Sequence, residues 1–73
     1  MNENEQTKVF QIVGMTCGHC KRAVESAIQS TQGVREVRVE LDAGKATVTG
    51  RFPDDAIVAS VEDAGYTATL LNA

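Results

Sequence analysis

The hydrophobic pattern of the first half of the chain changes from a period of two to a helical period. Within residues 8–13, KVFQIV, Phe10 and Ile12 share one face, which predicts a half-buried strand. From Gly18 onward the apolar positions recur at the spacing of an amphipathic helix. These positions are Cys20, Val24, Ala27 and Ile28. Gly33 is expected just past the end of this helix, because glycine adopts a left-handed backbone at little cost.

The second half of the chain predicts a hairpin, a second helix and a last strand. Apolar and polar residues alternate over residues 37–49 on both sides of the turn sequence LDAGK, which is typical of a β-hairpin. Pro53 and the two acids after it predict a helix start, with proline in the first turn and carboxylates at the positive end of the helix dipole. Its apolar stripe is Ile57, Val61 and Ala64. Gly65 is expected to close this helix, and residues 66–71 predict a final strand.

The resulting order, βαββαβ, predicts an α+β fold of the ferredoxin-like class. In this sandwich a four-stranded antiparallel sheet carries two helices on one face. The other face is expected to meet water, because its strand positions are rich in threonine. With 73 residues the chain has room for a single domain, residues 1–73, of which residues 1–7 are expected to form a flexible N-terminus.

Composition and charge restrict which classes of partner and which cellular compartment are expected. The composition is that of an ordinary small globular protein, and the net charge of −3 argues against nucleic acid, since phosphate binding favours a basic face. No apolar stretch approaches the roughly 20 residues of a membrane helix. The opening residues MNENEQTK lack the apolar centre of a secretion signal. We therefore expect a soluble, cytoplasmic protein without direct membrane insertion.

The candidate chemistry lies in the sequence GMTCGHC, which holds the chain's two cysteines, Cys17 and Cys20. Residues three apart on a helix are separated by only about 60° around the axis, so both sulfurs can reach one ion. The helix N-terminus is expected to lower the thiol pKa values, and Lys21 is expected to add to this effect. A structural disulfide is not expected in a reducing compartment. The pair therefore predicts either metal or redox chemistry.

Among metals, two soft thiolates in an exposed turn favour Cu(I), an ion that accepts few ligands. Structural zinc normally takes four ligands, and this chain offers two sulfurs and one imidazole. His19 lies about 100° from Cys20 and about 160° from Cys17 on the helical count. We therefore expect His19 to be an exposed residue that tunes the thiols. Binding of another soft ion, such as zinc, mercury or silver, is the alternative at the same site.

Two residues before the cysteines have expected supporting roles. Thr16 is positioned to cap the helix start with its hydroxyl. Met15 is apolar and precedes the helix in a protein with a small core. It is expected to tuck beneath the loop and hold it, rather than to bind metal through its thioether.

A thiol–disulfide oxidoreductase is the alternative that the letters CGHC raise, because a CxxC pair at a helix start also attacks disulfides. The thioredoxin fold needs a longer chain and a proline opposite the cysteines. The only proline here, Pro53, is explained by a helix start, and the chain has no tryptophan before CGHC. A third interpretation, two inert thiols with Cys20 facing the core, leaves the exposed Cys17 unexplained.

The sequence GMTCGHC, followed by a helix and then by GVREVRV and EDAGY, resembles the heavy-metal-associated domain across essentially the whole chain. The resemblance is to small bacterial copper chaperones and to the soluble modules of copper-transporting P-type ATPases. It implies the βαββαβ fold, Cys17 and Cys20 as Cu(I) ligands, and Met15 as the buried prop of the loop. Members tuned for zinc often have an acidic residue where this chain has Thr16, which favours copper.

Tyr66 matches a position near the metal loop that is commonly tyrosine in the bacterial copper chaperones. It is expected to shield the site or to form a hydrogen bond near the sulfurs, or else to cap the edge of the core.

The resemblance also implies a function as a free carrier and not as an enzyme. Such a carrier passes Cu(I) to the soluble domain of a copper-transporting P-type ATPase by ligand exchange, and a copper-responsive regulator is a second candidate partner. Lys21 and Arg22 beside the metal are expected to contribute to docking by charge. We expect a monomer, or a copper-bridged dimer in which His19 approaches the shared metal.

Overall fold

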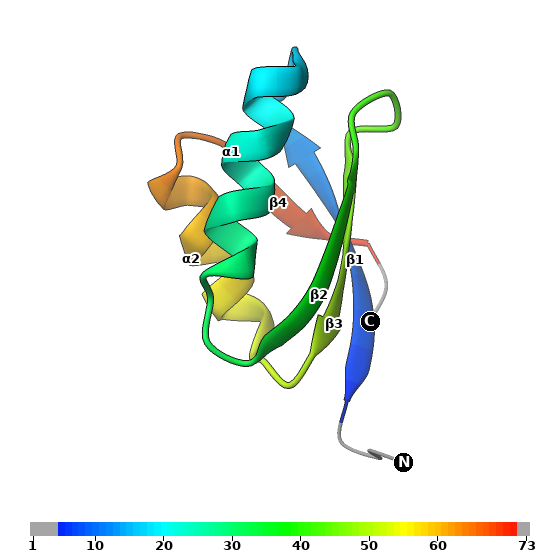
Figure 1. Ribbon diagram of the computed structural model, residues 1–73, viewed down its shortest axis with the longest axis vertical. Helices are drawn as coiled ribbons and strands as arrows, with labels where there is room; N and C mark the ends of the chain where they lie inside the picture. Colours follow the sequence, from blue (N-terminus) through cyan, green and yellow to red (C-terminus); the bar gives the residue numbers. More distant parts are fainter. Residues whose placement is uncertain (1–4, 72–73) are drawn as a thin grey trace.

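The computed structural model describes residues 5–71, which form four strands and two helices in the order βαββαβ (Figure 1). The sheet has the strand order β2-β3-β1-β4, and all neighbouring strands are antiparallel. The predicted ferredoxin-like sandwich is therefore confirmed. The elements are β1 (Gln6–Val13), α1 (Gly18–Gln29), β2 (Val34–Glu40), β3 (Lys45–Gly50), α2 (Asp54–Asp63) and β4 (Thr67–Leu70).

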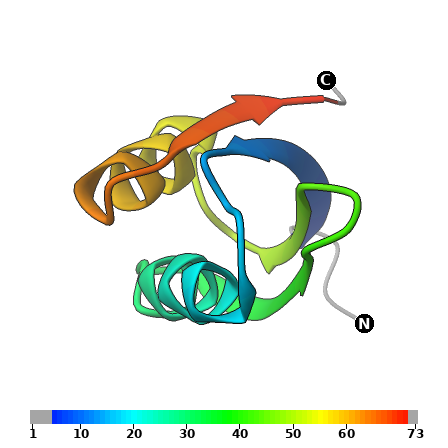
Figure 2. The ribbon, with the colours of Figure 1, turned by 90° about the horizontal axis from the view of Figure 1, so that it is seen from above.

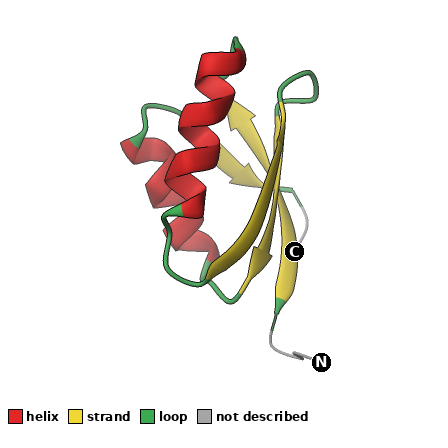
Figure 3. Ribbon diagram, viewed as in Figure 1, coloured by secondary structure: helices red, strands yellow, loops and turns green. Residues whose placement is uncertain are grey.

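The two helices lie side by side on one face of the sheet and leave the other face uncovered (Figures 2 and 3). On the uncovered face Thr67 and Thr69 are exposed, and Thr47 and Thr49 are half-buried. Neighbouring strands pair across this face, for example at Val9 of β1, which lies opposite Thr47 of β3. The expected solvated, threonine-rich face is therefore present.

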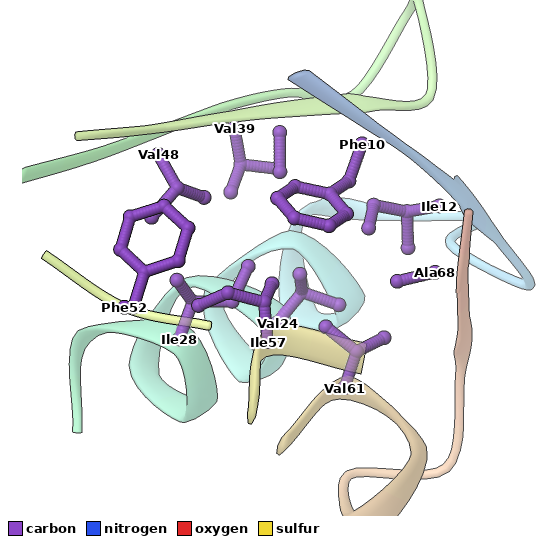
Figure 4. Close-up of a cluster of buried hydrophobic side chains, with 11 residues drawn as sticks. Phe10, Ile12, Val24, Ile28, Val39, Val48, Phe52, Ile57, Val61 and Ala68 are labelled. Carbon is purple, nitrogen blue, oxygen red and sulfur yellow. The ribbon is translucent and has the colours of Figure 1, made fainter. Parts of the chain in front are cut away.

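The core fills the space between the helices and the sheet, and every element contributes to it (Figure 4). Phe10 is fully buried in the central strand β1, and Ile57 is fully buried on α2. Within residues 5–71 no buried side chain is polar or charged. The buried residues are Phe10, Ile12, Val24, Ile28, Val39, Ala46, Val48, Phe52, Ile57, Val61 and Ala68. Hydrophobic burial is therefore the main contribution that holds the helices against the sheet.

Strand β1 begins at Gln6, two residues before the predicted start at Lys8. Gln6 and Thr7, expected to lie in a flexible N-terminus, pair with Gly50 and Thr49 of β3. Glu5 of the same segment forms an ion pair with Arg35, and residues 1–4 lie outside the described residues. Within residues 5–71 neither helix has the length and apolar character needed to span a membrane.

Helix α1 begins at Gly18 as predicted, but Gly33 does not close it. The helix ends at Gln29 with Ser30 as its cap, and Gly33 lies at the entry to β2 with φ +95°. A Cβ at Gly33 would lie 1.9 Å from the carbonyl oxygen of Arg51. The Arg51 N–H donates a hydrogen bond of 2.8 Å to the Gly33 carbonyl. The glycine is therefore required by a close approach of two backbones, and its assignment as a helix end was wrong.

Helix α2 begins one residue later than predicted, with Pro53 at the N-cap instead of in the first turn. Its C-terminus follows the prediction: Gly65 has φ +97°, and its N–H donates a 3.0 Å hydrogen bond to the Glu62 carbonyl. The Tyr66 N–H donates a 3.1 Å bond to the Val61 carbonyl. These two bonds define a Schellman motif. Tyr66 therefore belongs to this turn and precedes β4, which the sequence had predicted to include it.

Candidate metal centre

The cysteines lie where the chain leaves β1 and enters α1, at one end of the sandwich (Figure 1). Gly14, with φ +100°, turns the backbone out of the sheet, and Met15 packs its half-buried side chain against the core. Cys17 is the N-cap of α1, with an extended backbone, and its carbonyl accepts the first helical hydrogen bond from the Lys21 N–H at 3.1 Å. Cys20 therefore lies in the first turn, as predicted, and Met15 lies beneath the loop.

The two sulfurs lie 3.6 Å apart, and the Cys17 thiol donates a hydrogen bond to the Cys20 sulfur. Cys17 is exposed and Cys20 is half-buried. With metal–thiolate bonds of about 2.3 Å, a linear two-coordinate ion needs about 4.6 Å between its sulfurs. The pair therefore has to widen by about 1 Å, which a rotation of the exposed Cys17 side chain can provide. The predicted convergence of both thiols on one point is present in the geometry.

The pKa of the Cys20 thiol is lowered to about 6, principally because the Tyr66 hydroxyl donates a hydrogen bond to its sulfur. The backbone of Thr16 is the second cause, followed by the Cys17 and Thr16 side chains, while burial acts in the opposite direction. The sequence had attributed the lowered pKa to the helix N-terminus and to Lys21. Directed hydrogen bonds from a residue 46 positions away and from the loop account for it instead.

Tyr66 has both of the roles considered for it. Its half-buried ring packs against the core, and its hydroxyl donates to the Cys20 sulfur. The same hydrogen bond raises the pKa of Tyr66, because a phenolate could not donate it. The phenol therefore remains a hydrogen-bond donor at neutral pH.

Thr16 does not cap α1, in contrast to the prediction. The N-cap is Cys17, and no side chain caps the helix start. The Thr16 hydroxyl lies 3.8 Å from the Cys20 sulfur instead. The physical reason is that α1 begins at Gly18, which leaves Thr16 one residue before the N-cap, where its backbone and side chain form hydrogen bonds with the Cys20 sulfur. Thr16 therefore acts on the site and not on the helix.

The remaining predicted residues surround the thiols without converging on them. His19 and Arg22 are exposed, and Lys21 is half-buried beside a surface hollow shared with Arg38 and Asp42. In the described part of the chain no three His, Cys, Asp or Glu side chains gather closely enough to hold a metal ion. The site therefore offers two thiol ligands from one molecule, and a further ligand has to come from water or another molecule.

Comparison with known proteins agrees with this geometry. Residues 9–67 match the heavy-metal-associated domain. The chain belongs to this family. A copper chaperone CopZ from Staphylococcus saprophyticus subsp. saprophyticus is 40% identical over 65 residues, which cover 82% of this chain and 93% of that protein.

Solved structures extend the likeness to the fold. Oxidized MerP from Ralstonia metallidurans CH34 matches with a TM-score of 0.89 and 30% identity, over 93% of this chain and 99% of that chain. A copper binding domain from HMA7, a P-type ATPase, matches with a TM-score of 0.88 and 30% identity, over 90% and 93% of the two chains. The predicted family and the ferredoxin-like fold are thus confirmed.

One contributor to the site of this heavy-metal-associated domain was missed in the sequence. A Cβ at Gly14 would lie 3.3 Å from Cδ1 of Tyr66, so this glycine leaves room for the tyrosine ring. Gly14 is visible in the sequence only as the end of a strand. Its contact depends on the packing of the β1–α1 loop against the α2–β4 turn, which no local pattern reports.

The hydrogen bonds at Cys20 predict a specific pH dependence. In the metal-free Cys17→Ser variant, which keeps the hydrogen bonds from Tyr66 and Thr16, alkylation of the remaining thiol is expected to rise with a midpoint well below the ordinary cysteine pKa of 9.0. Because the folded pKa is depressed, the stability contributed by this thiolate is present at high pH and lost as pH falls through about 6. Metal retention is expected to weaken over the same range, since protons compete for the thiolate.

The control for this titration is the same variant carrying Tyr66→Phe, measured with the same alkylating reagent. Removal of the hydroxyl is expected to move the midpoint upward, because its hydrogen bond is the largest cause of the low value. A midpoint of 9.0 with tyrosine present, or one that does not respond to phenylalanine, would contradict the assignment.

Proposed function

We propose that this protein is a copper chaperone that binds Cu(I) through Cys17 and Cys20 and passes it to the soluble domain of a copper-transporting P-type ATPase. The observation that carries the proposal is the pair of thiols 3.6 Å apart in a loop at the end of the domain. One thiol is exposed, and the other is held as a thiolate by hydrogen bonds at neutral pH.

The donor set favours Cu(I) over zinc. Two soft thiolates suit a soft ion of low coordination number, whereas a structural zinc site needs four ligands. The described residues supply no third His, Cys, Asp or Glu close to the pair. The similarity to copper chaperones named CopZ and to the copper binding domain of a P-type ATPase supports the same ion. Binding of zinc, mercury or silver remains the alternative cargo.

Transfer requires an ion that a second protein can reach, and the loop is suited to this. A thiolate of the receiving domain attacks the two-coordinate ion, which then holds three sulfurs until one original thiolate leaves, and a second thiolate of the receiving domain displaces the other. Cys17 is the more exposed of the two ligands, so an incoming thiolate meets the ion on its side. No covalent bond of a substrate is made or broken, and the protein is proposed to be a carrier and not an enzyme.

Docking is proposed to use the surface around the loop. Arg22 is exposed on α1 next to the cysteines, and Lys21 borders the hollow between α1 and the β2–β3 hairpin. Such charges increase the encounter rate more than the affinity. The P-type ATPase is the proposed recipient. A copper-responsive regulator, a copper-bridged dimer and a cytoplasmic location stay predictions.

The test is an anaerobic titration of the reduced protein with Cu(I) in the presence of a strong competing chelator. The expected result is that one copper per chain is withheld from the chelator. Parallel titrations with Zn(II) under the same conditions are expected to show weaker retention. If the chelator retains all of the copper, the proposal is wrong.

The thiol–disulfide oxidoreductase remains the second candidate, because the sulfur separation and the lowered pKa of Cys20 also suit disulfide exchange. Reduction of insulin disulfides distinguishes the two functions. A carrier is expected to be no faster than a small thiol at equal thiol concentration, whereas an oxidoreductase turns over catalytically.

A further inference from the structure

Tyr66 lies in the turn between α2 and β4, and its ring packs beside Gly14 in the loop that leads to the cysteines. Gly65 and Tyr66 close the C-terminus of α2 in the Schellman motif, with hydrogen bonds to Glu62 and Val61. Gly65 has φ +97°, a backbone conformation that L side chains rarely adopt. The direction in which the chain leaves α2, and with it the phenol, is therefore determined by this one residue.

Space around Gly65 is not the reason for the glycine. A Cβ added there would meet no heavy atom within 4 Å, so only the backbone conformation favours glycine at this position. At Gly14 the situation is different, because a Cβ would lie 3.3 Å from the Tyr66 ring itself. One glycine therefore sets the path of the backbone that carries the tyrosine, and the other leaves room for its ring.

We propose that Gly65 and Gly14 are positioning residues of the metal site, which act by placing the Tyr66 ring against the β1–α1 loop, with its hydroxyl as a hydrogen-bond donor to Cys20. This inference rests on the proposed function for its link to copper. Neither glycine touches the ion, and each acts only through the phenol. The position of Tyr66 links the end of α2 to the loop that carries the thiols. It gives Cys20 a hydrogen-bond donor that its own helix does not provide.

The test compares Gly65→Ala with Gly65→Asn and with the control Gly44→Ala. Asparagine tolerates the left-handed conformation. It is expected to preserve the position of Tyr66, because there is room for a side chain at position 65. Gly44 is also left-handed, with φ +64°, but a Cβ there would approach the backbone of Ile12 and not Tyr66. It introduces a side chain at a second left-handed turn without disturbing the tyrosine.

Two measurements are made on each variant. The first is Cu(I) retention against a chelator, where Gly65→Ala is expected to lose about 10-fold, the lower range for loss of a group that orients a metal ligand. The second is the acrylamide quenching of tyrosine fluorescence in the metal-free protein. Tyr66 is the only tyrosine and the chain has no tryptophan, so the fluorescence reports the accessibility of the Tyr66 ring alone. Quenching is expected to increase in Gly65→Ala and to stay at the wild-type level in Gly65→Asn and Gly44→Ala.

A double variant separates positioning from a general loss of stability. In the Tyr66→Phe background, Gly65→Ala is expected to cause no further loss of copper retention, because the hydroxyl that it positions is already absent. An equal loss in both backgrounds would overturn the proposal, as would unchanged fluorescence quenching in Gly65→Ala. Gly14→Ala crowds the same ring from the loop side but also strains a backbone with φ +100°, so this variant is compared by fluorescence quenching alone, where an increase is expected.

The outcomes also separate this inference from the proposed function. If the wild-type protein withholds no copper, the chaperone proposal fails, whereas the fluorescence measurement still decides whether the glycines seat Tyr66. If copper is withheld equally well by wild type and Gly65→Ala, the chaperone proposal stands and the positioning role is wrong.

Discussion

Replacement of Cys17 by serine is expected to weaken Cu(I) retention by at least about 1,000-fold, since even the loss of a group around a metal ligand commonly reduces affinity 10–100-fold. The variant keeps one thiol, Cys20, and the described residues offer no third ligand to compensate. A hydroxyl is a hard, protonated donor that a soft ion does not favour. The measurement is the copper fraction withheld from a competing chelator under anaerobic, reducing conditions.

The matched control for this experiment is His19→Gln, which changes the neighbouring exposed residue between the two cysteines. Within a monomer, this variant is expected to retain copper to within about threefold of the wild-type protein, because His19 is not part of a three-ligand cluster in the described chain. Copper binding that survives Cys17→Ser unchanged would disprove the two-thiolate site. A loss in His19→Gln comparable to that in Cys17→Ser would make the imidazole a ligand.

The second large effect is expected in the core, where Phe10→Ala should reduce the free energy of unfolding by about 3–5 kcal/mol. Phe10 is fully buried at the centre of β1, which pairs with both β3 and β4 (Figure 4). A domain of this size is stable by only about 5–10 kcal/mol. The melting temperature of the metal-free protein is therefore expected to fall by about 15 °C or more, as measured by circular dichroism.

Val13→Ala is the control in the same strand, because Val13 is 57% exposed. Its effect on the free energy of unfolding is expected to stay within about 0.5 kcal/mol, which is usual for surface positions. Equal destabilisation by the two variants would show that the inner face of β1 does not carry the packing assigned to it. Copper is expected to raise the melting temperature of both variants, by an amount that grows with the logarithm of its free concentration.

The fold was largely predictable because its signals are local. The change of hydrophobic period located all six elements, and Gly65 marked the end of α2 correctly. Two of the errors occurred where the conformation of a residue depends on a partner distant in the sequence. Gly33 was read as a helix end, but it is required by the approach of the Arg51 backbone. Pairing with Gly50 and Thr49 extends β1 to Gln6, where the local pattern had predicted a flexible segment.

In the candidate site, too, some features were predictable from the sequence and others were not. The spacing of Cys17 and Cys20 at a helix start was sufficient to place both sulfurs on one face, and the structure shows them 3.6 Å apart. The role of Thr16 was misread, because its cap position depended on where the helix begins, and Cys17 takes that position. Tyr66 was singled out by resemblance, but its hydrogen bond to the Cys20 sulfur could not be derived from the sequence.

The amino-acid sequence by itself determined the element order, the buried face of each element and the pair of thiols, because each depends on side chains a few residues apart. The tertiary structure alone decided which thiol is held as a thiolate and by what. The hydrogen bond from Tyr66 to Cys20 joins the end of α2 to the start of α1, and Gly14 leaves room for the ring, because a Cβ there would lie 3.3 Å from it. Such contacts arise from the packing of elements distant in sequence, and therefore have no periodic or local signature in the sequence.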